Sequence, residues 1–179
     1  MTAINKKEAL NIERIANKEF AEHILTNVTD NTWRCHKKGT GNYSYYVTLQ
    51  ANYILIYGDI GQAFFCVNED VNVFLKGFHI ENGYYDYILG KLQDSSWYKH
   101  YDEEVAKEHL KHCFIDEEIP KEIQEALDSE LGCYDDFYRA IDDYISDAWE
   151  ITAYSWTCQA MWAVEALKKF IELRDKVKE

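Results

Sequence analysis

The chain has 179 residues, of which 47% are hydrophobic and 15% aromatic, and its formal net charge at neutral pH is −13. This composition supports a buried core and excludes a disordered chain, while the length suits one domain or a domain with a small annex. No apolar run approaches the length of a membrane helix, and the negative charge disfavours direct contact with nucleic acid.

The excess charge is concentrated in one segment. Residues 94–150 contain 18 acids and 5 bases, whereas residues 1–93 contain 10 acids and 9 bases and residues 151–179 contain 4 acids and 5 bases. The two flanking regions therefore sum to zero, and the middle segment holds all of the excess. Such a field attracts basic surfaces.

The cysteines and the N-terminus indicate the compartment. Five cysteines occur at wide spacings and without a CxxC pair, which is typical of free thiols in a reducing cytoplasm. The N-terminal segment lacks the apolar core of a signal peptide. We therefore expect a cytoplasmic protein.

In chain order, the first predicted element is an amphipathic helix over residues 4–26, where apolar residues recur at intervals of three and four. The pattern then changes to β. TWRC, YSYYVTL, YILIYG and QAFFCVN are predicted strands, and NVFLKGFHI fits a further strand, although NEDVNVFLKG also fits a short helix. We expect a small antiparallel sheet of three to four strands.

From residue 84 onward, helical patterns dominate. Helices are predicted over residues 84–93, 102–114, 119–132, 133–150 and 152–177. The last of these is apolar around nearly its whole circumference, so it is either the central core helix or part of a homodimer interface. The fold class is α+β, in a single domain over residues 1–179. Residues 1–93 form its helix-plus-sheet portion, and residues 94–179 form its acidic helical portion.

The stretch YILIYGDIG places an acid, Asp59, between Gly58 and Gly61 at the end of a predicted strand. A catalytic or phosphate-binding loop and a tight turn both fit this pattern. No helix follows Gly61 to present a phosphate-binding N-terminus, and no base lies nearby in sequence. The pattern therefore favours a turn in which Asp59 is structural.

The candidate binding site is the acidic face of the predicted helix over residues 134–150. On a helical wheel its carboxylates fall within about 140°, opposite the apolar residues. They are Asp135, Asp136, Asp142, Asp143, Asp147 and Glu150. Carboxylates at this spacing could imitate the phosphates of nucleic acid and occupy a basic groove. The alternative is a solvated helix face. The preceding helix, over residues 117–130, is acidic as well.

Several other groups of residues are candidate sites. His109, His112 and Cys113 could ligate a transition metal, but they lack the His-x-x-x-His spacing of zinc proteases and fit the edge of an apolar stripe better. Cys35 lies between Arg34 and His36, which could lower its pKa. No cofactor, metal ligand or catalytic residue is predicted with a complete pattern.

Residues 32–93 carry a family resemblance. The elements are TWRC, KKGTGNYSYYV, YILIYGDIG, FFCV, FLKGFHI and YYDYILGKLQ. This order resembles an uncharacterised family of bacteriophage and prophage proteins with W-R-C, G-T-x-x-Y, G-D-I-G and F-H-I elements. The resemblance covers about one third of the chain. It implies a phage or mobile-element origin and supplies no catalytic residue.

The leading hypothesis is an anti-defence inhibitor that binds without turnover, active in the bacterial host cell. Its partner would be a host protein or ribonucleoprotein with a basic surface, such as a CRISPR effector, with no direct contact to nucleic acid or membrane. The alternative is a protein that binds or sequesters a small molecule such as a nucleotide. Its pocket would be lined by Trp33, Tyr43, Tyr45, Tyr46, Tyr53 and Tyr57, with Arg34, Lys37 and Lys38 meeting a phosphate. An enzyme using Asp59 or the His109, His112 and Cys113 group is the third hypothesis.

Overall fold

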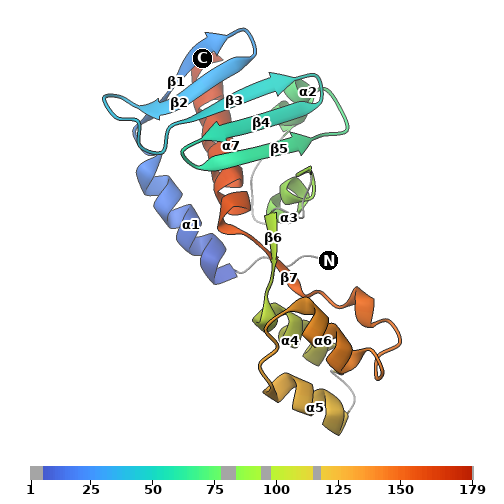
Figure 1. The fold of residues 1–179 in the computed structure, drawn as a ribbon. Coiled ribbons are helices and arrows are strands. Elements are labelled where there is room, and N and C mark those ends of the chain that lie inside the picture. Colours follow the sequence, from blue (N-terminus) through green and yellow to red (C-terminus); the bar gives the residue numbers. More distant parts are fainter. Residues whose placement is uncertain (1–5, 78–83, 94–97, 115–117, 179) are drawn as a thin grey trace. The chain divides into compact units, whose positions relative to one another are not determined.

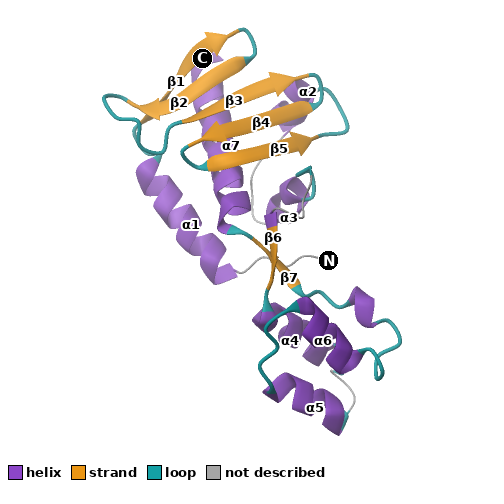
Figure 2. Cartoon of the chain, viewed as in Figure 1, coloured by secondary structure: helices purple, strands orange, loops and turns teal. Residues whose placement is uncertain are grey.

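The computed structural model describes residues 6–77, 84–93, 98–114 and 118–178. It confirms the α+β class, with an N-terminal helix, an antiparallel sheet and a helical C-terminal half (Figures 1 and 2). The sheet has five strands, one more than the upper expectation. The extra strand, β1 (His23–Thr29), begins within residues that the sequence pattern assigned to the first helix.

The chain divides into two compact units. The sheet unit comprises Lys6–Tyr98 and Thr157–Glu179, and the described part of the other, the helical unit, comprises Lys99–Trp156. Residues 157–179 therefore group with the sheet, whereas we expected them to group with the acidic helices. The single domain over residues 1–179 stays a prediction.

Each strand of the sheet is hydrogen-bonded to its sequence neighbours in an antiparallel meander. The strands are β1 (His23–Thr29), β2 (Thr32–Lys37), β3 (Tyr45–Gln50), β4 (Tyr53–Gly58) and β5 (Gly61–Cys66). Their aromatic and β-branched residues alternate between a buried inner face and a wetter outer face, because successive side chains of a strand point to opposite sides. In register, Val47, Ile56 and Ala63 lie side by side on the inner face.

The inner face is covered by α7 (Cys158–Lys178), with α1 (Lys6–Glu19) beside it (Figure 1). The Tyr45 hydroxyl donates a buried hydrogen bond of 2.9 Å to the carbonyl of Ala166 on α7, and the rings of Trp33 and Phe170 lie 5.5 Å apart. The last helix is therefore the core helix of the sheet unit. A homodimer through it stays a prediction, and among the described residues Val177 is its one exposed large apolar side chain.

The first predicted helix is too long. It ends at Glu19, and His23–Thr29 instead pairs with β2 as β1. The run HILTNVT contains β-branched residues that fit a pleated surface, and this tertiary pairing overrides the helical spacing of Ile24. Residues 71–77 adopt the helical alternative as α2 (Val71–Gly77), and α3 spans Tyr84–Leu89. The FHI residues, 78–80, lie outside the described residues.

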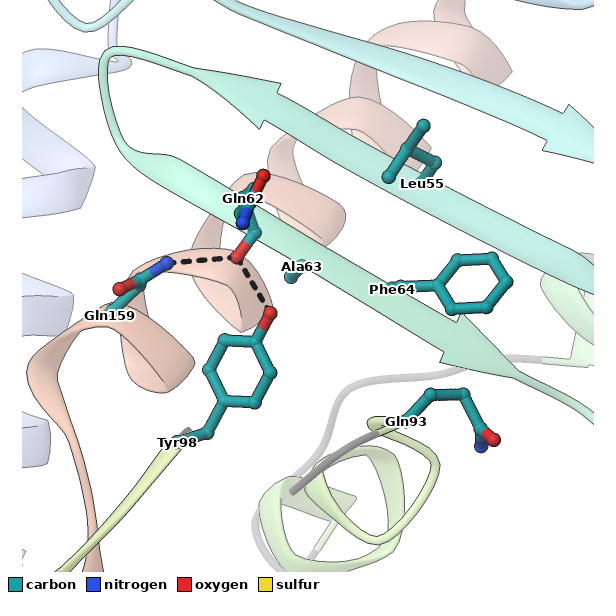
Figure 3. A pocket seen from close by; sticks show the side chains of 7 residues that line it. All are labelled: Leu55, Gln62, Ala63, Phe64, Gln93, Tyr98 and Gln159. Carbon is teal, nitrogen blue, oxygen red and sulfur yellow. Dashed lines mark hydrogen bonds between the residues drawn. The ribbon is translucent and has the colours of Figure 1, made fainter. Parts of the chain in front are cut away.

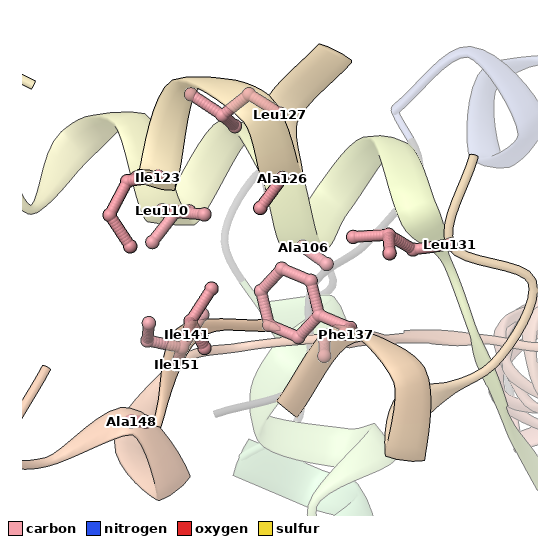
Figure 4. Close-up of a cluster of buried hydrophobic side chains, with 11 residues drawn as sticks. Ala106, Leu110, Ile123, Ala126, Leu127, Leu131, Phe137, Ile141, Ala148 and Ile151 are labelled. Carbon is pink, nitrogen blue, oxygen red and sulfur yellow. The ribbon is translucent and has the colours of Figure 1, made fainter. Parts of the chain in front are cut away.

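The helical unit has its own apolar core (Figure 4). Its elements are β6 (Lys99–Tyr101), α4 (Glu103–His112), α5 (Lys121–Asp128), α6 (Tyr134–Ile141), the 3-10 helix η2 (Ala148–Glu150) and β7 (Tyr154–Trp156). Asp102 caps α4 by accepting a hydrogen bond of 3.2 Å from the Val105 N–H. Leu110, Ile123, Phe137 and Ile141 are fully or almost fully buried between the three helices.

The predicted helices over residues 133–150 and 152–177 are both wrong in extent. The first stops at Ile141, because its continuation would place Asp143 four residues before Asp147 and Asp147 three before Glu150, and like charges at these spacings destabilise a helix. The chain turns instead, so that Ala148 and Ile151 join the core. The second begins at Cys158, because Tyr154–Trp156 pairs with β6.

The Gly58–Gly61 stretch is a turn with a structural acid, as expected. Asp59 donates its backbone N–H to the Ser44 carbonyl at 2.9 Å, and its Oδ2 accepts the Ser44 N–H at 3.2 Å. These bonds tie the β4–β5 turn to the start of β3. Gly58 has a φ of +148°, and a side-chain carbon there would lie 2.5 Å from the Ser44 carbonyl oxygen. Glycine is therefore required at this position by both conformation and close approach.

We expect Gly58→Ala to lower the free energy of unfolding by about 2–4 kcal/mol, because the new methyl group collides with backbone atoms and the φ is strained. The matched control is Gly41→Ala, where a side-chain carbon would meet nothing within 4 Å. That change should stay within about 0.5 kcal/mol of the parent in urea titrations followed by circular dichroism. Equal costs for the two substitutions would contradict this role of Gly58.

Candidate functional site

The six predicted site carboxylates are all exposed in the helical unit. Asp135 and Asp136 lie in the first turn of α6, and Asp142 is its C-terminal cap. Asp143 follows in the turn, Asp147 precedes η2, and Glu150 ends it. We call these six residues the acidic surface. They do not form one helical stripe, so a phosphate-like spacing along a single helix face is not present.

The acidic surface is poorly neutralised by its own chain. Within the described ranges, none of its six carboxylates has a Lys, Arg or His nitrogen within 4.0 Å. Asp136 Oδ2 accepts a hydrogen bond of 3.2 Å from the Cys133 thiol. An exposed carboxylate without an internal cation keeps its Coulomb attraction available for an external one.

Charge segregation follows the boundaries of the units closely. Lys99–Trp156 contains 17 acids and 5 bases, a net charge of −12, while the rest of the chain contains 15 acids and 14 bases, a net charge of −1. Two of the five bases in the helical unit are already paired, Lys107 with Glu103 at 2.7 Å and Lys121 with Glu125 at 3.3 Å. The hydrogen bond from Lys107 lowers the pKa of Glu103, so that acid stays ionised.

The HLKHC group does not assemble into a metal site. The Nδ1 atom of His109 accepts the Thr152 N–H, and burial lowers the pKa of this histidine, which favours the neutral ring that accepts the bond. Cys113 donates its thiol to the His109 carbonyl at 3.4 Å. Across the part of the chain that the structure describes, no three His, Cys, Asp or Glu residues are grouped to hold a metal ion.

The expected lowering of the Cys35 pKa is wrong. Cys35 points to the inner face of the sheet and is fully buried, and this burial raises the pKa of its thiol to about 12. Its sequence neighbours Arg34 and His36 point to the opposite face, because adjacent residues of a strand alternate. Alternation therefore separates the thiol from the charges that were expected to activate it.

The same alternation divides the aromatic residues that were predicted to line one pocket. Trp33 and Tyr45 lie on the inner face, where Tyr45 is fully buried and Trp33 partly buried, while Tyr46, Tyr53 and Tyr57 lie on the outer face. Tyr43 stacks on Trp162 with ring centroids 5.4 Å apart. Of the proposed phosphate-binding bases, Arg34 donates to the Ser44 hydroxyl at 3.1 Å and Lys37 pairs with Glu22. The predicted pocket is therefore not formed by these residues.

A different hollow opens beside β5, with a volume of about 530 Å³ (Figure 3). The described residues that line it are neutral: Leu55, Gln62, Ala63, Phe64, Gln93, Tyr98 and Gln159. The carbonyl oxygen of Gln62 accepts hydrogen bonds of 3.0 Å from both the Tyr98 hydroxyl and the Gln159 side-chain amide. Gly61 has a φ of +94°, and a side-chain carbon there would lie 2.9 Å from the Gln159 amide. This glycine therefore lets Gln159 lie against the strand.

Sequence reasoning missed this hollow because its residues come from three separated segments and follow no motif. The alternation of Leu55 and Phe64 with buried neighbours could have placed both on the outer face. The approach of Gln93 and Gln159 to β5 depends on tertiary packing. The N–H of Gln93, for instance, donates to the Phe64 carbonyl at 2.8 Å.

No protein-family model, curated protein or solved structure matches the chain. The resemblance to a phage family stays a prediction. Over the described helices, none is both long enough and apolar enough to span a membrane.

The reactivity of the cysteine thiols tests which cysteines are buried and which are exposed. At pH 8 we expect iodoacetamide to modify the exposed Cys113 and Cys133 within minutes and to leave Cys35 unmodified until the chain unfolds. Cys158 is exposed too, but its 2.6 Å hydrogen bond to Glu8 raises its pKa and should slow its reaction. Peptide mass spectrometry reads each site separately. Fast native labelling of Cys35 would contradict its burial.

Proposed function

We propose that the chain acts by binding, without turnover, and that its acidic surface contacts a basic surface of a partner protein. The observation that carries this proposal is the concentration of charge. One separately cored unit has a net charge of −12, and within the described residues the six carboxylates of its acidic surface form no ion pair. A rigid apolar core beneath a charged surface holds the carboxylates in place, which reduces the entropy lost on binding.

The partner class follows from the same charges. A surface built to bind nucleic acid carries Lys and Arg to neutralise phosphates, so it is basic enough to attract the helical unit. We propose a host protein or ribonucleoprotein of this kind, such as a CRISPR effector, in the bacterial cytoplasm. The anti-defence role and the phage origin rest on the family resemblance and on this charge. The six carboxylates are spread over α6, the following turn and η2. This arrangement suits contact with an irregular protein surface better than it suits imitation of the regularly spaced phosphates of nucleic acid.

The test is capture of the tagged chain's partner from nuclease-treated bacterial lysate, followed by measurement of the dissociation constant. Asp143→Lys with Asp147→Lys should weaken binding at least about tenfold, because two attractive charges become repulsive. Both residues are exposed, and neither has a side-chain hydrogen bond or ion pair among the described residues. Raising the salt concentration should weaken parent binding too.

The matched control is Asp30→Lys with Glu69→Lys, which makes the same change in net charge at exposed positions of the sheet unit. Binding by this control should stay close to that of the parent. If the two double variants lose affinity equally, net charge alone matters and the acidic surface is not the site. If neither loses affinity, the proposal is wrong.

A second candidate function, binding of a nucleoside or nucleotide, is favoured by the neutral hollow beside β5. Side-chain amides at Gln93 and Gln159 can pair with the edge of a nucleobase, and Phe64 offers an aromatic surface. Among the described lining residues none carries a charged side chain, so the base and not the phosphate would supply the affinity.

Saturation-transfer NMR with adenosine and cytidine at millimolar concentration tests this candidate. We expect a signal that Gln93→Ala weakens about threefold to tenfold through loss of one hydrogen-bonding amide, while Gln50→Ala, at the end of β3, leaves it unchanged. The corresponding monophosphates should bind no more tightly than the nucleosides. Absence of any signal at millimolar ligand would rule out this candidate.

A further inference from the structure

The outer face of the sheet is covered by none of the elements that bury its inner face. Tyr53, Leu55 and Tyr57 on β4 and Phe64 on β5 remain 37–39% exposed. The rings are ordered across the strands. Tyr46 stacks on Tyr57 with centroids 5.2 Å apart, and Tyr53 stacks on Phe64 at 5.0 Å. Three neighbouring strands, β3–β5, thus present a preorganised aromatic and aliphatic surface, which is unusual for a face left open to water.

This face is also free of negative charge. The five strands contain no Asp or Glu, although the chain has 32 such residues. The permanently charged side chain on the outer face of β2–β5 is Arg34. It is held over the Tyr46 ring at 5.8 Å and donates to the Ser44 hydroxyl. A guanidinium fixed in this way loses little conformational freedom when another surface covers it.

The residue composition of the outer face indicates whether it binds nucleic acid or protein. A track for single-stranded nucleic acid needs a line of basic residues, and β2–β5 place one arginine and one histidine, His36, on this face. Protein interfaces, in contrast, are enriched in Tyr, Phe and Arg and depleted of Lys, Asp and Glu at their cores. The outer face of β2–β5 has the composition of a protein interface.

We propose that the outer face of β2–β5 packs against the same face of a second copy of this chain. Two chains of net charge −13 repel each other, so close self-association requires a surface without carboxylates, and this sheet face meets that requirement. Sheets stack face to face about 10 Å apart, which leaves room for one interdigitating layer of Tyr, Leu and Phe from each copy.

A two-fold axis parallel to the strands, between β3 and β4, suits the distribution of charge. It lays β2 of one copy over β5 of the other, because the axis reverses the order of the strands. Arg34 then faces the neutral edge around Gln62 and Phe64, and the two arginines stay apart. Rings from β3 and β4 meet at the centre, where desolvation is most complete.

The area of the outer face sets the expected affinity of the dimer. Four strands, β2–β5, spaced about 4.8 Å apart and six residues long present roughly 400 Å² per copy, or roughly 800 Å² for the pair. This lies below the standard size of a specific interface, so the dimer should be weak and reversible, with a dissociation constant on the order of 100 µM. Such a dimer would present two helical units, and a repetitive basic partner would be bound with avidity.

Sedimentation equilibrium tests the proposal between about 1 and about 500 µM protein. We expect the parent to rise from the monomer mass of 21.1 kDa toward twice that value. Leu55→Lys at the centre of the face should remain a monomer throughout, because it buries an unpaired charge. Its matched control is Leu10→Lys, at a 66% exposed position of α1, which should dimerise like the parent.

A parent that stays monomeric over the whole range would overturn the proposal, whatever the variants do. So would a folded Leu55→Lys protein that dimerises normally, with folding checked by circular dichroism. If Leu55→Lys does not fold, Tyr57→Lys on the same face takes its place with the same expectation. A monomeric parent that binds a fluorescent oligothymidine would assign the face to nucleic acid and would also overturn the proposal.

Discussion

Burial of the inner sheet face beneath α7 is the interaction on which the rest of the sheet unit depends. Residues from the far C-terminal end of the chain complete a core that β2–β5 begin, and the hydrogen bond from Tyr45 to Ala166 joins positions 121 residues apart. The chain therefore returns to the sheet after Lys99–Trp156, which lies between the two segments of the sheet unit in sequence. That segment packs around its own core and is free to carry a different surface chemistry.

The two units use opposite surface chemistry. In the helical unit, exposed carboxylates outnumber the available cations, whereas the strands of the sheet unit contain no Asp or Glu. Charge at one surface supports attraction to a basic partner, and its absence at the other supports close apolar contact. The neutral hollow beside β5 adds hydrogen-bonding amides near the apolar face. Both proposed interactions follow from this separation of charge from apolar surface.

Local sequence signals predicted much of the sheet unit. Alternation marked β2–β5 correctly, and the glycines around Asp59 indicated a turn that the Ser44 hydrogen bonds confirm. Failures occurred where tertiary pairing or repulsion outweighed local periodicity. His23–Thr29 became a strand because β2 offered a partner, and the helix after Cys133 stopped before its aspartates could align.

The candidate site was predictable only in part. Composition located the charge, and the structure places all six acidic residues at the surface, but it distributes them over a helix, a turn and η2. Strand alternation could have separated Cys35 from Arg34 and the inner aromatic residues from the outer ones. The hollow depends on contacts of Gln93 and Gln159 with β5, and these contacts leave no local pattern in the sequence.

Hydrogen–deuterium exchange of the chain alone and in complex with its captured partner tests the role of the acidic surface most directly. We expect partner-dependent protection of backbone amides in residues 134–150, because a covered surface opens and exchanges more slowly. Peptides that contain β3 and β4 should exchange their backbone amides at the same rate in the complex as in the free chain. Protection confined to the sheet unit, with residues 134–150 unchanged, would contradict binding through the acidic surface.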